Sequence, residues 1–301
     1  HFRRLRLQRQ GFSRGSPVGM KKNNKVSKML TLDINNPQEH CNLACEFCYS
    51  WNLEGMLSLS DVQRIVEENK EHSIVELGGG EPLLHKEIAD IVSYLTLDMD
   101  KKVHIATNGT YLPQKLLSLS QESRDITQMQ ISLHASNKQL FGEITAKPHL
   151  FDKVMQNIPV FKEYFVTLVN TVVYQKNFED ISNIVELVKQ YRLPHRVMLA
   201  FPEGRGKEAA LLSSGQIAEL TSYLLAENAN GSRIDSSLLR PSNCPALAQA
   251  YGIQSEGICP AEAGKKKYVT ASGSKGCEFL PSALIPLRRS KNYGGDKYAT
   301  R

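Results

Sequence analysis

Short β-rich runs alternate with helical patterns along most of this chain, and no other feature restricts the possible folds as strongly. Each strand-like run is followed by a segment with the apolar spacing of a helix. The six runs are Met29–Asn35, Ser73–Leu77, Lys102–Ala106, Gln128–Leu133, Val166–Tyr174 and Arg196–Phe201. Strand–helix units in series form parallel sheets with right-handed crossovers. Six units are two short of a closed eight-fold barrel, so the pattern predicts an α/β fold with a partial, open, TIM-like (β/α)6 barrel.

The alternation stops beyond about residue 232, and the character of the chain changes there. Residues 240–281 contain many glycines and one short strand-like run, Lys267–Thr270. The sequence therefore predicts a barrel over residues 29–231 and a small cysteine-containing extension over residues 232–301. A basic tail, residues 1–28, precedes the barrel.

The formal net charge of +6 comes from the first 28 residues, which hold nine basic side chains and no acidic one. Residues 29–301 therefore carry a formal charge of −3, without the basic stripe of a nucleic-acid-binding protein. The tail fits a disordered arm, a transit-like segment, or non-native sequence ahead of a start at Met20, and Met-Lys-Lys at 20–22 favours the last. Since no apolar run reaches about 18 residues, we expect no membrane association.

The six cysteines fall into two groups of three, at positions 41, 45 and 48 and at positions 244, 259 and 277. The N-terminus has no apolar segment typical of secreted proteins, so we expect a cytoplasmic protein with reduced thiols. Odd-numbered groups of thiols suit metal binding better than closed disulfide pairs.

Cys41, Cys45 and Cys48 lie in the loop after the first predicted strand, ahead of a helix that we expect to begin with a capping box at Ser60 and Gln63. Cysteine thiolates are the usual ligands of iron–sulfur clusters, and three ligands for four irons leave one iron open. The alternative is a zinc site, with the adjacent His40 as a further ligand.

The spacing Cys41-x3-Cys45-x2-Cys48, with the aromatic Phe47 before the last cysteine, resembles the motif of the radical S-adenosylmethionine (radical SAM) superfamily. The resemblance extends over about residues 29–205. It implies a [4Fe-4S] cluster whose open iron binds the amino and carboxyl groups of SAM. One electron, from a reductant such as ferredoxin or flavodoxin, would then cleave SAM to a 5′-deoxyadenosyl radical that abstracts hydrogen from a substrate.

The resemblance continues at Gly79-Gly80-Glu81, which follows the second predicted strand. In the family this motif lies along the methionine moiety of SAM, and the carboxylate at the Glu81 position takes its ammonium group. The resemblance also implies that Phe47, Asn108, Ser132 and Asn170 line the SAM pocket. Turn formation alone also explains Asn108-Gly109, and a structural role is favoured for His134.

The second cysteine group resembles the twitch or SPASM extensions of radical SAM enzymes, which hold an auxiliary [4Fe-4S] cluster. Cys244, Cys259 and Cys277 would ligate it, and Pro202–Gly206 resembles the segment that joins barrel and extension. Those modules often end with a further close pair of cysteines, but no cysteine follows Cys277 here. The fourth iron would therefore be open or bound by another residue. The alternative is three unrelated buried cysteines.

These patterns leave four candidate functions. The first is a radical SAM enzyme that oxidises or cross-links a ribosomal peptide, and the second applies the same chemistry to a small molecule, as the molybdenum-cofactor cyclases or enzymes of antibiotic biosynthesis do. A non-catalytic iron–sulfur protein and a zinc-binding module are the others. Gly79-Gly80-Glu81 argues against both, because neither needs a SAM pocket.

Overall fold

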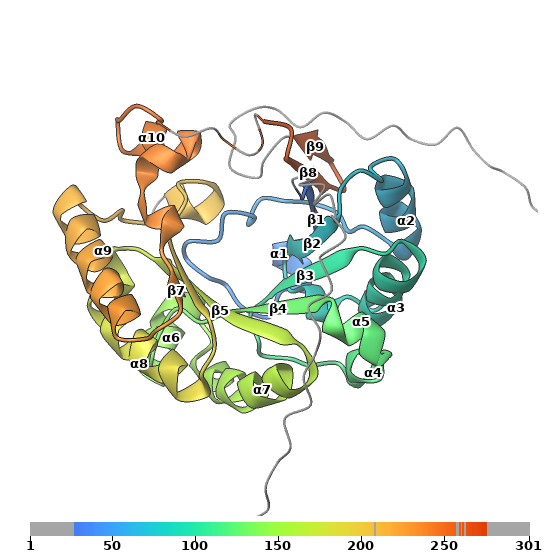
Figure 1. The fold of residues 1–301 in the computed structure, drawn as a ribbon, viewed down its shortest axis with the longest axis horizontal. Helices are drawn as coiled ribbons and strands as arrows, with labels where there is room; N and C mark the ends of the chain where they lie inside the picture. Colours follow the sequence, from blue (N-terminus) through green and yellow to red (C-terminus); the bar gives the residue numbers. More distant parts are fainter. Residues whose placement is uncertain (1–26, 208, 257–258, 260, 262, 276–301) are drawn as a thin grey trace, which may run out of the picture.

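The computed structural model describes residues 27–207, 209–256, 259, 261 and 263–275, and these form one curved sheet with helices outside it (Figure 1). The strand order is β7-β6-β5-β4-β3-β2-β1-β8-β9. The strands are β1 (Met29–Asn35), β2 (Ile74–Gly79), β3 (Lys102–Thr107), β4 (Thr127–Ser132), β5 (Val166–Val173), β6 (His195–Leu199), β7 (Ile234–Asp235), β8 (Lys266–Thr270) and β9 (Gly273–Lys275). Strands β1 to β6 pair in parallel in chain order, which confirms the predicted partial barrel.

Most of the helices cover the outer side of the sheet (Figure 1). The α-helices are α1 (Pro37–His40), α2 (Leu59–Glu67), α3 (Ile88–Ser93), α4 (Gln114–Leu117), α5 (Gln121–Asp125), α6 (Lys138–Thr145), α7 (Phe151–Tyr164), α8 (Ile181–Tyr191), α9 (Ser214–Ala229) and α10 (Pro245–Ala250). Apolar side chains on alternate strand positions, such as Val75, Val103 and Ile131, are fully buried beneath this layer. Within the described part of the chain, no helix has the length and apolar character needed to cross a membrane.

The C-terminal strands join both edges of the barrel sheet. Strand β7 extends the sheet beyond β6, while β8 lies parallel to β1 and forms a hairpin with β9. Side chains reinforce the β8 pairing: the Tyr268 hydroxyl donates to Asp33 at 2.6 Å, and the Lys267 ammonium group donates to Asn69 at 2.7 Å. The strand-like run predicted at Lys267–Thr270 is present as β8, but it belongs to the main sheet, whereas the sequence placed it in the appended extension. Of the predicted tail, only residues 27–28 are described.

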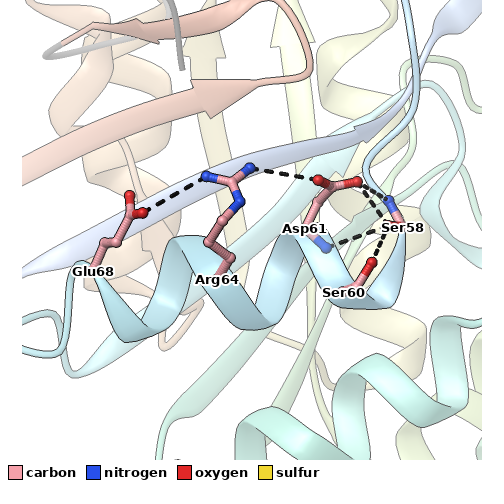
Figure 2. Close-up of polar contacts among 5 residues, drawn as sticks. All are labelled: Ser58, Ser60, Asp61, Arg64 and Glu68. Atoms are coloured by element: carbon pink, nitrogen blue, oxygen red, sulfur yellow. Dashed lines mark hydrogen bonds and ion pairs between the residues drawn. The ribbon is translucent and has the colours of Figure 1, made fainter. Parts of the chain in front are cut away.

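The start of α2 differs from the prediction (Figure 2). The capping box is formed by Ser58 and Asp61, since the Asp61 N–H donates to the Ser58 hydroxyl and the Ser58 N–H donates to the Asp61 carboxylate. The predicted capping box, at Ser60 and Gln63, was wrong, because it lies two residues too far along the chain. Leu57 and Val62, which flank this box at the positions of a hydrophobic staple, are both buried in the core. Burial of that apolar pair therefore selects the earlier of two similar sequence patterns.

Candidate cofactor site

A cavity of about 210 Å³ lies where the C-terminal ends of the barrel strands converge. The residues predicted from the first cysteine group and from the following strand ends all line it: Cys41, Cys45, Phe47, Cys48, Gly79, Gly80, Glu81, Asn108, Ser132 and Asn170. These residues come from segments up to 129 positions apart in the chain. The parallel order of β1 to β5 brings them together, because each of them follows or ends a strand at the same edge of the sheet.

The cysteine loop is held by hydrogen bonds from elements far along the chain. Its backbone N–H groups at Ala44 and Glu46 donate to the carbonyls of Thr145 and Ile144, at 3.0 and 3.1 Å. These carbonyls end helix α6, where no intrahelical donor remains for them. The Tyr174 hydroxyl, just after β5, donates to the Glu46 carboxylate at 2.5 Å. The loop is thus fixed in place by the opposite half of the barrel.

Burial raises the pKa of all three thiols in this loop. The pKa of Cys41 rises to about 12, and repulsion from Glu81 and Cys48 adds to the effect of burial. The pKa values of Cys45 and Cys48 are raised for the same principal reason. Thiols so placed ionise only when a positive partner compensates them, and iron ions provide that charge. This donor set of three partly buried cysteines around one cavity fits a [4Fe-4S] cluster.

The zinc alternative needs several ligands around one ion. Among the described residues, no group of three or more His, Cys, Asp or Glu side chains could hold a single metal ion. His40 lies next to Cys41, and its Nδ1 has no hydrogen-bond partner among the described residues, but it is not part of any such group. The cysteine triad therefore shares a cavity without forming a compact mononuclear site.

Gly79 and Gly80 let the end of β2 pass directly against the end of β1. Gly79 has a φ of +102°, and a Cβ there would lie 2.4 Å from the carbonyl oxygen of Asn35. A Cβ on Gly80 would lie 2.8 Å from the carbonyls of Asn36 and His40. Only glycine fits these positions, so the motif is required for the approach of the two loops as well as for any ligand.

Glu81 is 1% exposed, and its carboxylate ties the end of β2 to the end of β3. Oε1 accepts from the Leu83 N–H at 2.9 Å and the Thr107 hydroxyl at 2.8 Å, and Oε2 accepts from the Asn108 N–H at 2.6 Å. Burial raises the pKa of Glu81 to about 7 despite these bonds. Within the described residues, Oε2 accepts only one bond, so it retains capacity for a further donor.

Asn108 connects the cysteine loop with the end of β3. Its amide donates to the Asn42 side chain at 2.9 Å and lies 3.9 Å from the Cys41 sulfur, while its Oδ1 accepts from Thr110. Asn108 thus takes part in a turn and also lines the cavity, and its role toward SAM stays a prediction.

Ser132 and Asn170 are paired across β4 and β5 at the wall of the cavity. The Oδ1 atom of Asn170 is buried and has no hydrogen-bond partner among the described residues. A buried polar atom of this kind needs a partner, so the Asn170 amide marks a point where a bound ligand would donate a hydrogen bond.

Phe47 and His134 pack together on the other side of the cavity. Phe47 is 9% exposed, and its ring meets His134 edge-on at 4.7 Å and Tyr174 at 5.3 Å. The His134 Nδ1 accepts from the Val172 N–H at 3.1 Å, and burial lowers the pKa of His134 to about 3. His134 is thus a neutral residue in a packed position, which supports its structural interpretation.

Three contacts of the cysteine loop could not be read from the sequence. Ser50 donates to the Gly79 carbonyl at 3.2 Å, Tyr174 bonds to Glu46, and Arg205 bonds to the carbonyl of Ala44. The last two join residues 128 and 161 positions apart, so no local spacing indicates them.

The structure describes two of the three C-terminal cysteines. Cys244 precedes α10 and is partly buried, and Cys259 is 6% exposed; neither is in a disulfide. Cys277 lies outside the described residues. The predicted auxiliary set therefore stays a prediction.

Comparison with known proteins agrees with this geometry. The model of the radical SAM superfamily matches residues 35–188, just over half of the chain. An AdoMet-dependent heme synthase of Methanosarcina barkeri is 27% identical over 56% of this chain and 50% of its own. A probable GTP 3′,8-cyclase of Sulfurisphaera tokodaii is 30% identical over 67% of this chain and 65% of its own. The chain thus spans half to about two thirds of the length of these relatives.

Solved structures show a similar fold over more of the chain. SuiB of Streptococcus suis, bound to S-adenosylmethionine, has a TM-score of 0.69 at 17% identity and covers 87% of this chain and 63% of its own. Native anSMEcpe with bound AdoMet has a TM-score of 0.62 at 18% identity, over 84% of this chain and 75% of its own. The cysteine motif, the strand-end cavity and the matched family model lead to one conclusion: this chain belongs to the radical SAM superfamily.

Proposed function

We propose that the cavity binds a [4Fe-4S] cluster through Cys41, Cys45 and Cys48, with SAM at the open iron. The observation that carries this proposal is the convergence of the thiols, the Gly79–Glu81 backbone and the Asn170 amide on one cavity. When bound, the cluster and SAM supply the one-electron cleavage that yields a 5′-deoxyadenosyl radical.

The protein contributes binding, orientation and exclusion of water. The remaining lone pair of Glu81 Oε2 accepts from the ammonium group of SAM, and the Asn170 Oδ1 accepts from a hydroxyl group of the same ligand. The glycines of β2 present their backbone without side chains in the way. Phe47 and the apolar cavity wall around it keep water from the reacting atoms.

The proposed substrate is a ribosomal peptide, which the 5′-deoxyadenosyl radical oxidises or cross-links by taking hydrogen from it. Ferredoxin or flavodoxin supplies the electron that cleaves SAM. The likeness in fold to SuiB, over 87% of the chain, supports this. A SuiB structure with its precursor peptide SuiA has the same likeness in fold.

A small molecule is the second candidate substrate. The names of the sequence relatives favour it, because the heme synthase and the GTP cyclases are both named for small molecules. Incubation of the reconstituted enzyme with SAM, reductant and either class of substrate separates the candidates. Substrate-dependent 5′-deoxyadenosine above the background rate identifies the class that is used.

We further propose that residues 232–301 form a twitch/SPASM-like module in which Cys244, Cys259 and Cys277 bind an auxiliary [4Fe-4S] cluster. Glycines beside the second and third of these cysteines support it, as does the β8–β9 hairpin between them. Anaerobic reconstitution should give about eight irons per chain if both clusters form. About four irons per chain in both the wild type and Cys244→Ser would show that no auxiliary cluster forms.

The central test replaces Cys41, Cys45 and Cys48 together by Ser. This variant should lose about four irons and all reductive cleavage of SAM with dithionite, measured as 5′-deoxyadenosine by chromatography. Cys244→Ser is the matched control, and it should keep the cleavage because Cys244 lies outside the cavity. Persistent cleavage in the triple variant would contradict the proposed site.

A further inference from the structure

The segment after β6 lies directly against the cysteine loop, although the proposed chemistry assigns it no role. The Arg205 backbone N–H donates to the carbonyl of Cys48 at 3.0 Å. Gly204 has a φ of +56°, and a Cβ there would lie 2.5 Å from the Cys48 carbonyl. A Cβ on Gly206 would lie 3.2 Å from the carbonyl of Phe47. Glycines on both sides therefore allow the Arg205 backbone to reach the loop.

The Arg205 side chain adds two contacts with the same loop. Its Nη1 donates to the carbonyl of Ala44 at 3.1 Å, on the residue before Cys45. Its guanidinium group lies over the Trp51 ring, 4.6 Å from the centroid. Because the guanidinium is planar, it can stack on the indole and donate hydrogen bonds in its own plane at the same time.

Arg205 is also a positive charge beside two of the three thiols. Its guanidinium group binds the residue before Cys45, and its backbone binds Cys48 itself. Among the described residues, no carboxylate lies within ion-pair distance of Arg205, whereas the nearby Lys176 is paired with Glu46. The charge of Arg205 is therefore available to the thiolates.

We propose that Arg205 is a positioning residue that holds the Ala44–Trp51 part of the cysteine loop and supplies a fixed positive charge that raises the reduction potential of the cluster. This inference rests on the proposed function, since it assumes a cluster on these cysteines. Reduction adds one electron to the cluster, and a nearby cation stabilises the more negative, reduced form. Net charge and hydrogen bonding around the ligands are known to set cluster potentials.

Three variants separate the two parts of this role. Arg205→Gln removes the charge and the stacking, whereas Arg205→Lys keeps the charge without a planar group. Lys207→Gln is the matched control, because it removes an exposed charge from the same segment. The measurements are the midpoint potential of the reconstituted cluster, followed by electron paramagnetic resonance, and the fluorescence of Trp51 in iron-free protein. Trp51 is the only tryptophan in the chain, so its emission reports the stacking contact directly.

Arg205→Gln should lower the midpoint potential, Arg205→Lys should restore most of it, and Lys207→Gln should leave it near wild type. Trp51 emission should change in both Arg205 variants and not in Lys207→Gln. Poor iron loading in Arg205→Gln that Arg205→Lys repairs would also support the charge role.

Two results would overturn the inference. Equal potentials in all four proteins at full iron content would refute the charge role, and unchanged Trp51 emission in Arg205→Gln would refute the contact that holds the loop. Wild-type protein that binds no iron would overturn the proposed function and the charge role together, while the emission comparison still decides the contact.

Discussion

The two faces of the barrel sheet differ in kind although the same strands build both. Outward-facing residues such as Val75, Val103 and Ile131 are apolar and fully buried under the helices. Inward-facing positions carry polar groups, and some of these are linked to each other: Arg196 donates to Gln130 at 3.1 Å, and Gln130 donates to Glu76 at 3.4 Å. A closed eight-stranded barrel fills its interior with bulky branched side chains. This open barrel keeps a polar interior beside the cofactor cavity.

The comparison shows a division of tasks between neighbouring residues. Outward positions contribute most of the buried apolar area and hence most of the free energy of folding. Inward positions contribute little apolar area, and some of them, such as Ser132 and Asn170, line the cavity. Substitutions on the two faces should therefore change different measured quantities, even when they are adjacent in the chain.

Ile131 and Ser132 test this division most directly, because they are neighbours on β4 that face opposite sides. Ile131→Ala should lower the free energy of unfolding by about 2–5 kcal/mol, since it leaves a cavity beneath α7. Ser132→Ala should cost less than about 1 kcal/mol and weaken SAM binding by roughly three- to tenfold. Denaturant titration and isothermal calorimetry with SAM measure the two effects. Equal losses of stability in both variants would show that the two faces of the sheet do not differ in their contribution to folding.

His195 gives the outward face a dependence on pH. It is 3% exposed, its Nε2 lies 2.8 Å from the Thr171 hydroxyl, and burial lowers its pKa to about 4. In the unfolded chain histidine titrates near 6.5, so between these values the unfolded state binds more protons. Stability is therefore complete above about pH 6.5 and is lost as the pH falls toward 4.

Between pH 6.5 and 5 this loss should reach about 2 kcal/mol from His195 alone. His195→Gln keeps a donor toward Thr171 without titrating, so its stability should fall by that much less over the same interval. Urea titrations at the two pH values provide the measurement. A variant that loses as much stability as wild type would show that His195 does not carry the effect.

The N-terminus of α2 provides the smallest expected effect and concerns the helical layer alone. Ser58→Ala removes the capping hydroxyl drawn in Figure 2 and should cost about 1 kcal/mol. Ser60→Ala, at the position predicted from sequence, should cost less than about 0.5 kcal/mol because its side chain is exposed. SAM affinity should stay unchanged in both, which thermal unfolding and calorimetry can check. A larger loss of stability in Ser60→Ala than in Ser58→Ala would support the capping box predicted at Ser60 instead.

The fold followed from the sequence because its periodic patterns are long. The first strand, Met29–Asn35, begins and ends where the pattern predicted, since nearly all of its residues are buried and apolar residues alternate with polar ones. Strand β6 ends two residues earlier than predicted, at Leu199. The chain then turns toward Gly204 and the cysteine loop, and this turn is a tertiary requirement that strand propensity does not encode.

The cavity residues were predictable where a motif lies at a strand end, as at Gly79-Gly80-Glu81. The contacts that hold the motif were not. The sequence suggested only that Glu81 takes the ammonium group of SAM, whereas three donors from Leu83, Thr107 and Asn108 already bind its carboxylate. Arg205 lies in Pro202–Gly206, which the sequence marked only as a connecting segment, and its contact with Ala44 exists only after the barrel has formed.

The pairing of β8 with β1 also has a consequence for any shortened form of this protein. Strand β1 is buried along nearly its whole length, and β8 occupies its free hydrogen-bonding side. A protein cut after residue 231 would expose that row of unpaired amides on a strand with one apolar face. Such an edge is a template for pairing between molecules, so the truncated barrel should aggregate. The C-terminal segment thereby protects the solubility of the barrel, whatever its cysteines bind.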